Sequence, residues 1–327
     1  MHDRALVQSR DEASFAEFVQ SLDERGVHIV CAAGPEGVAA AALLGKALLR
    51  AGVPQSGATA LSFGEPVDSA RVRDWLAEEA ALVLVGLRGR RAPLDVPQWS
   101  LDASDDEPLA ARAFAAGEEL VHLADASWCA AIGLVGRAEP HVLVERALAR
   151  CTRSELEAAA ALLDAAARGP EPALESLNAG AMLVAAPDLR RFLDSVPAAA
   201  LRQTQAVVAA ELARASRVRP RPGFGVVVVE YDSACRIEDL VAERWRGLRP
   251  GTVVLVANFG AVEGAVAVTA RAAVREALDR LRYALNDEGT TLLDPDTWSQ
   301  LKERLGVAPP PVEREPSGAF PLSALPN

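Results

Sequence analysis

The 327-residue sequence has few of the residue types that mark several common protein classes. Its cysteines form no C-x-x-C pair and have no histidine at zinc-ligand spacing, so zinc ribbons and disulfide frameworks are excluded. Free thiols in a reducing compartment are expected instead. No apolar run reaches the roughly 18 residues that span a bilayer, and no export signal is evident, so we expect a cytoplasmic protein without membrane contact. The four cysteines are Cys31, Cys129, Cys151 and Cys235.

Basic charge is also in short supply. The sequence has 34 Lys and Arg against 45 Asp and Glu, which gives a net charge of −11. This balance argues against a protein that coats nucleic acid indiscriminately, but it leaves a local basic groove open. Aromatic residues make up only 5% of the chain, so the cores must be built from small aliphatic side chains.

Apolar runs and Ala-rich amphipathic segments alternate through the first half of the chain. Strands are predicted at 27–31, 81–85 and 98–101, and helices at 11–24, 38–50, 69–79 and from 109 onwards. Runs that are apolar throughout are typical of parallel strands buried on both faces. The pattern therefore predicts an α/β fold with a doubly wound, mostly parallel sheet, in which 27–31 and 81–85 are neighbouring strands.

The length fits two domains, since about 150 residues is typical of one. Helical segments are predicted at 126–150, 154–167, 187–193 and 198–215. A basic, proline-containing break at 217–223 separates this helical region from a second run of strands and helices. Strands are predicted there at 226–230, 253–257 and 264–269, with helices at 237–246 and 272–285. We predict an α/β domain at 1–150, a helical connector and linker at 151–222, a smaller mixed α/β domain at 223–305 and a Pro-rich flexible tail at 306–327.

A Gly-Pro-Glu-Gly loop, residues 34–37, lies between the first predicted strand and its helix, where open α/β sheets place ligands. It is no phosphate-binding P-loop, because Gly45-Lys46 lacks the upstream glycine and the following Ser or Thr. Lys46 is therefore interpreted as a solvated helix residue.

The stretch VCAAGPEGVAAAALLGKALLRAG, residues 30–52, resembles the first motif of RecJ-like DHH phosphoesterases, a strand, an Asp-x-Asp-Gly loop and an Ala-rich helix. The resemblance puts the two metal-binding aspartates on Gly34 and Glu36. The aspartate after the second strand falls on Gly86, and AAIGLVGR resembles the fourth motif with Arg137 in place of its aspartate. The Asp-His-His motif falls on Asp102, Ala103 and Ser104.

GAVAVTAR resembles the strand of the DHH-associated domain that ends in a substrate-contacting arginine, here Arg271. The implied metal site is thus a relic that keeps two carboxylates, Glu36 and Asp102. Two carboxylates beside the guanidinium of Arg137 are too few for a Mn²⁺ or Mg²⁺ pair, so we expect no cofactor unless substitute ligands keep the site active. Arg137 either forms a structural salt bridge with Glu36 or Asp102 or attracts a phosphate.

The sequence thus predicts a catalytically impaired DHH-type pseudo-phosphoesterase that acts as a binding or scaffold protein. Its expected partners are nucleic acid or a nucleotide in an interdomain cleft, or another protein. An active metal-dependent phosphodiesterase or exonuclease is one alternative, and a nucleotide sensor is another. The expected anion-binding residues are Arg88, Arg90, Arg91, Arg137 and Arg271.

Overall fold

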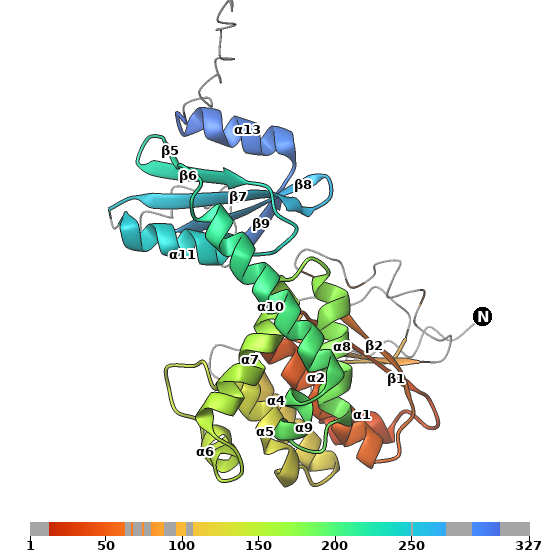
Figure 1. Cartoon of the computed structure of the whole chain (residues 1–327). Helices are drawn as coiled ribbons and strands as arrows, with labels where there is room; N and C mark the ends of the chain where they lie inside the picture. Colours follow the sequence, from red (N-terminus) through yellow and green to blue (C-terminus); the bar gives the residue numbers. More distant parts are fainter. Residues whose placement is uncertain are drawn as a thin grey trace, which may run out of the picture.

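Two sheets organise the molecule in the computed structural model (Figure 1). The residues that it describes are 13–62, 67, 74, 80–87, 96–102, 107–249, 251–272 and 290–307. One α/β unit surrounds the first sheet, a second surrounds the other, and a set of helices lies between them (Figure 1). Apart from residues 74, 272, 306 and 307, the predicted helices at 69–79 and 272–285 and the predicted tail lie outside the described residues.

The first sheet is parallel throughout, which confirms the predicted fold class. Its strands have the order β2-β1-β3-β4. They are β1 (Val27–Ala32), β2 (Gln55–Leu61), β3 (Ala81–Val85) and β4 (Gln98–Leu101). The predicted pairing of 27–31 with 81–85 is confirmed in β1 and β3. Strand β2 was not predicted.

The central strands β1 and β3 are buried on both faces, as the continuous apolar runs indicated. In β3, Ala81, Val83 and Val85 join the large core under the helices, whereas Leu82 and Leu84 join a smaller core on the other face. The helices of this unit are α1 (Phe15–Gln20), α2 (Pro35–Arg50), α4 (Leu109–Leu120), the short η1 (Ala124–Ala126), α5 (Ser127–Leu134) and α6 (Val142–Leu148). Helix α2 is central and packs against β1, α4 and α5.

Four helices lead to the second unit. They are α7 (Arg153–Arg168), α8 (Pro172–Ala185), α9 (Leu189–Leu193) and α10 (Val196–Ala215). Helix α8 was not predicted, although α7, α9 and α10 were. None of the helices in the described ranges has both the length and the hydropathy needed to cross a bilayer.

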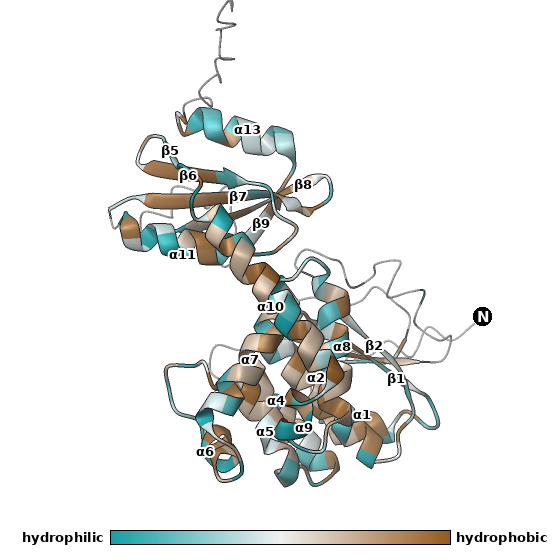
Figure 2. Ribbon diagram, in the orientation of Figure 1, coloured by the Kyte–Doolittle hydropathy of each residue, from teal (hydrophilic) through white to brown (hydrophobic). Residues whose placement is uncertain are grey.

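The second sheet is mixed and has the order β5-β6-β7-β8-β9. Strands β6 and β7 are parallel and joined by helix α11, while the other neighbours are antiparallel. Helices α11 and α13 cover opposite faces (Figure 1), and β6 and β7 are strongly hydrophobic whereas α13 is largely hydrophilic (Figure 2). The elements are β5 (Arg221–Pro222), β6 (Val226–Tyr231), α11 (Glu238–Leu248), β7 (Val253–Val262), β8 (Ala265–Arg271), β9 (Thr290–Leu293) and α13 (Pro295–Arg304). Of these, β5, β9 and α13 were not predicted.

Candidate functional site

The carboxyl edge of the first sheet brings several of the predicted site residues together. Strand β1 leads into Ala33 and Gly34, β3 into Gly86 and β4 into Asp102. The backbone pairing of β3 with β4 continues to this edge, where the N–H of Gly86 donates to the carbonyl of Leu101 at 2.8 Å. Strands β2 and β3 lie on opposite sides of β1, so the chain changes direction here, as it does where open α/β sheets bind ligands.

The turn from β1 into α2 depends on glycine. Gly34 is the N-cap of α2 and has φ = 138°, a conformation that side-chain-bearing residues rarely adopt. A Cβ atom on Gly37 would collide with the carbonyl oxygen of Ala32. The first turn of α2 is therefore pressed against the end of β1, and this contact places Glu36 at the sheet edge.

Glu36 is engaged by the protein itself. Its Oε1 accepts a 2.7 Å hydrogen bond from the backbone N–H of Leu109, the first residue of α4. No side chain of the N-cap Pro108 caps α4, so Glu36 supplies an acceptor for one of the free N–H groups of that helix. The carboxylate also benefits from the positive end of the α4 dipole.

Arg137 lies beside Glu36, with 3.8 Å between its Nη1 and Oε1 of the carboxylate. Helix α5 can approach α2 and α4 closely because Gly133 has no side chain. A Cβ atom at this position would lie 2.9 Å from Cβ of Ala110 and 3.4 Å from Cα of Glu36. The turn after α5 therefore carries Arg137 to the start of α2. Of the two predicted interpretations of Arg137, the structure shows the ion pair with Glu36. The two side chains are still 45% and 37% exposed.

The remaining predicted residues are less closely associated. Asp102 is exposed, and its backbone carbonyl accepts a hydrogen bond from Arg112. Arg271 ends β8 in the second sheet, where it donates to the carbonyl of Ala270 at 3.0 Å. The hydrogen bond from Arg246, and to a lesser degree the charge of Arg271, lowers the pKa of Glu243. Ala103, Ser104, Arg88, Arg90 and Arg91 lie outside the described residues, so the expected convergence of arginines stays a prediction.

The described part of this edge has few oxygen donors for a metal centre. Within the described ranges, no three His, Cys, Asp or Glu side chains are grouped as metal ligands would be. Among the described residues of this edge, the carboxylates are Glu36, which already contacts α4 and Arg137, and the exposed Asp102. A pair of divalent cations needs several hard oxygen ligands in one pocket, so these residues do not fit one.

Lys46 corrects one expectation. It was interpreted as a solvated residue, but it is buried. Its Nζ donates to the carbonyls of Val184 and Ala186 at 2.9 and 2.7 Å and lies 5.6 Å from the ring centre of Trp128. Burial lowers its pKa. Lys46 therefore satisfies the carbonyls at the end of α8 and takes no part in a phosphate site.

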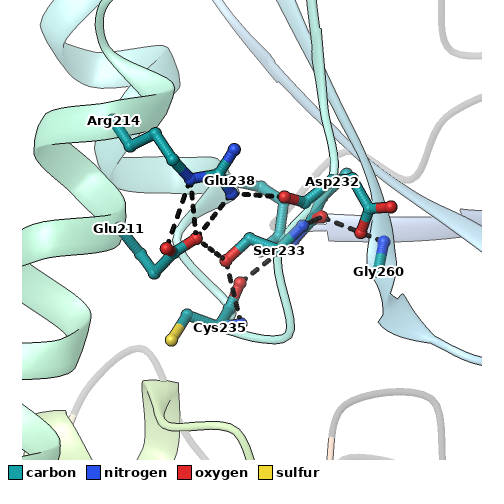
Figure 3. Close-up of polar contacts among 8 residues, drawn as sticks. Glu211, Arg214, Asp232, Ser233, Cys235, Glu238 and Gly260 are labelled. Atoms are coloured by element: carbon teal, nitrogen blue, oxygen red, sulfur yellow. Dashed lines mark hydrogen bonds and ion pairs between the residues drawn. The ribbon is translucent and has the colours of Figure 1, made fainter.

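A second polar cluster, at the carboxyl end of β6 and beside Asn258 in the middle of β7, was missed by the sequence analysis (Figure 3). Asn258 is fully buried; its Oδ1 accepts from the N–H of Ser233 at 2.9 Å, and its Nδ2 donates to Cys235 O at 2.9 Å and Glu238 Oε1 at 2.8 Å. Burial raises the pKa of Glu238. The only sequence signal was a short polar segment between a strand and a helix, which is common in α/β proteins.

The fold resembles several solved structures, while no protein-family model and no curated protein sequence matches the chain. RecJ from Thermus thermophilus, solved with Mn²⁺, is 16% identical with a TM-score of 0.58 over 89% of this chain and 54% of RecJ. An exonuclease RecJ bound to manganese is 15% identical, with a TM-score of 0.56 over 90% and 94% of the two chains. A DHH domain from a member of a ribosomal-protein family is 11% identical, with a TM-score of 0.54 over 89% and 80%.

This chain spans about half the length of the Thermus RecJ that it matches. Identities this low carry information about the fold alone. The element order that the sequence shares with DHH proteins is matched here by agreement in three dimensions over about nine tenths of the chain. The chain therefore has the RecJ-like DHH fold.

Proposed function

We propose that the chain is a catalytically impaired DHH-type phosphoesterase that acts as a binding or scaffold protein, with nucleic acid or a nucleotide as its ligand. The observation that carries the proposal is the double engagement of Glu36 by the N–H of Leu109 and the guanidinium of Arg137. A carboxylate held in this way stabilises the fold of the sheet edge. It is a poor substitute for a metal-binding aspartate.

Charge supports the same conclusion. A guanidinium keeps its positive charge at every physiological pH, so Arg137 repels a cation from the place where the DHH pattern has a metal-binding aspartate. The same charge attracts a phosphate, and its half-exposed position leaves its remaining donors available to a ligand. The solved neighbours include an exonuclease, whose substrate class gives the choice of nucleic acid or nucleotide. We place the protein in the cytoplasm because all four cysteines are free thiols.

The impairment is tested by Mn²⁺ titration calorimetry and by turnover of bis-nitrophenyl phosphate, short DNA and dinucleotides. The wild type is compared with a Glu36→Gln/Asp102→Asn double variant, since glutamine keeps an acceptor for Leu109 N–H while removing the charge. We expect no tight Mn²⁺ binding and no turnover that the double substitution abolishes. Tight binding and turnover that both disappear in the variant would replace the proposal with an active metal-dependent phosphodiesterase.

Ligand binding is tested with a fluorescent oligonucleotide and a labelled nucleotide at several salt concentrations. Arg137→Glu is expected to weaken binding at least about tenfold and to flatten the salt dependence. Arg153→Glu is the matched control, because Arg153 is also exposed and lies 3.9 Å from a glutamate, Glu157, on α7. Equal affinity and equal salt dependence in the two variants would remove Arg137 from the proposed site.

A further inference from the structure

The loop between β6 and α11, residues 232–237, is the place where the second α/β unit meets helices from the rest of the chain. Helix α7 approaches it from one side and α10 from the other. Loops that join a strand to a helix are often mobile, so the contacts that hold this one decide how freely the second unit can move.

On the α7 side, Arg168 makes a clamp from the last turn of its helix. Its Nη1 and Nη2 donate to the two carboxylate oxygens of Asp239 on α11 at 2.5 and 3.0 Å. Its Nε donates to Asp164, one turn earlier on α7, at 2.9 and 2.8 Å. The side chain is only 18% exposed, and two-pronged charged hydrogen bonds of this kind fix orientation as well as distance.

The backbone strengthens the clamp. The carbonyl oxygen of Arg168 accepts a 2.9 Å hydrogen bond from the N–H of Arg236 in the loop. The turn that follows Arg168 is tightly packed, because a Cβ on Gly169 would collide with the carboxylate of Glu175. Glu175 in turn accepts a 2.7 Å hydrogen bond from the hydroxyl of Thr204 on α10. Helices α7, α8 and α10 are thereby joined at the clamp.

On the α10 side, Glu211 accepts a 2.7 Å hydrogen bond from the hydroxyl of Ser233, and Arg214 donates to the carbonyl of Asp232 (Figure 3). The inner side of the loop is held by the buried Asn258. The loop is therefore bonded to both helices and to its own sheet.

Helix α10 is itself anchored in both cores. Near its start, Ala198 and Leu201 belong to the main core of the first unit. Near its end, Val208 and Ala215 belong to the core under α11 in the second unit. One continuous helix therefore connects the two cores without an intervening flexible segment.

We propose that the Arg168 clamp and α10 together fix the second α/β unit in one orientation relative to the first. The protein then presents its two sheets as a rigid platform rather than as two jaws that close on a ligand. The inference uses no residue of the proposed anion site, so it stands or falls independently of the proposed function.

The test measures the distance between the two units by pulsed electron paramagnetic resonance. Spin labels are attached at Glu145→Cys on α6 and Glu303→Cys on α13, both exposed positions, in the full-length chain. Cys151 is first replaced by serine because it is the one cysteine that is not fully buried. Arg168→Met removes the clamp, and Asp239→Asn weakens it with little change in shape.

The parent protein is expected to give one narrow distance distribution, and Arg168→Met to broaden it. Asp239→Asn is expected to broaden the distance distribution less. If Arg168→Met fails to fold, the comparison with Asp239→Asn tests the proposal. Amide exchange of residues 232–237 is expected to accelerate about tenfold or more in both variants. Arg153→Met is the control, because Arg153 is also on α7 but pairs with Glu157 of the same helix. It should change neither the distance distribution nor the amide exchange.

Two results would overturn the proposal. One is a broad distribution in the parent protein, which would show that the units already move freely. The other is a distribution that stays as narrow in Asp239→Asn and Arg168→Met as in Arg153→Met.

Discussion

Several buried or partly buried charged side chains of this protein serve its own backbone. Glu36 accepts from the start of α4, Lys46 donates to the end of α8, and Arg168 donates to the carbonyl of Arg236 in the loop before α11. Each supplies a hydrogen-bonding partner where the end of a helix or a loop needs one.

His28 gives the protein a predictable response to acid. It is fully buried in β1, its Nε2 lies 2.9 Å from the hydroxyl of Thr59, and burial lowers its pKa from 6.5 to about 4. Between these two values the unfolded chain binds a proton that the folded chain does not. The contribution of His28 to the free energy of unfolding is therefore fully present above about pH 6.5 and is lost as the pH falls toward 4. The loss between pH 7 and pH 5 is about 2 kcal/mol.

Urea unfolding of the wild type and of His28→Gln at pH 7 and pH 5 measures this contribution. The variant should lose less stability than the wild type over the same interval, because glutamine does not titrate. His122→Gln is the control, since the side chain of His122 is 81% exposed. A pH dependence in His28→Gln that equals that of the wild type would show that other groups account for it.

At the scale of elements, the start of α2 depends on a close contact with β1. Gly37→Ala is expected to destabilise the protein by about 2 kcal/mol, because the new Cβ meets the backbone carbonyl of Ala32, which cannot move without distorting the strand. This cost outweighs the roughly 1 kcal/mol that alanine gains over glycine in a helix. Thermal or urea unfolding measures the difference.

Gly136→Ala is the matched substitution at the same sheet edge. A Cβ at position 136 would have no atom within 4 Å, so its effect should stay within about 0.5 kcal/mol. Similar losses in the two variants would mean that a general loss of backbone flexibility, and not the contact with Ala32, explains Gly37.

Elements were predictable from sequence where local pattern and burial agree. Strand β3 is buried on both faces, so its sequence is a continuous apolar run that a search for strands detects. Strand β2 has the sequence QSGATAL and is exposed over its first half, so it has no such pattern. It forms because β1 offers a full row of backbone partners. Helix α8 contains Asn178 and Gly180, which weaken its pattern, and its packing against α2 and α7 compensates.

At the scale of the whole molecule, α10 should couple the unfolding of the two units. The wild type is expected to unfold in one calorimetric transition, because a single helix contributes to both cores. Ala206→Pro changes an exposed position in the middle of α10. It should lower the free energy of unfolding by about 3 kcal/mol or more and divide the unfolding into two transitions.

Ala206→Gly is the control, since it weakens the helix by about 1 kcal/mol without interrupting it. It should lower the melting temperature and keep one transition. Two transitions in the wild type, or a single one in the proline variant, would contradict coupling through α10.

The sequence by itself determined the α/β class, the parallel neighbours β1 and β3 and the positions of Glu36 and Arg137 at the ends of elements, because these depend on local hydrophobic pattern and on turn residues. Tertiary structure decided what those side chains do. Glu36 meets Leu109, 73 positions along the chain, and Lys46 meets carbonyls 138 and 140 positions away. Such pairings arise from helix packing that brings distant backbone groups together, and no local pattern encodes them.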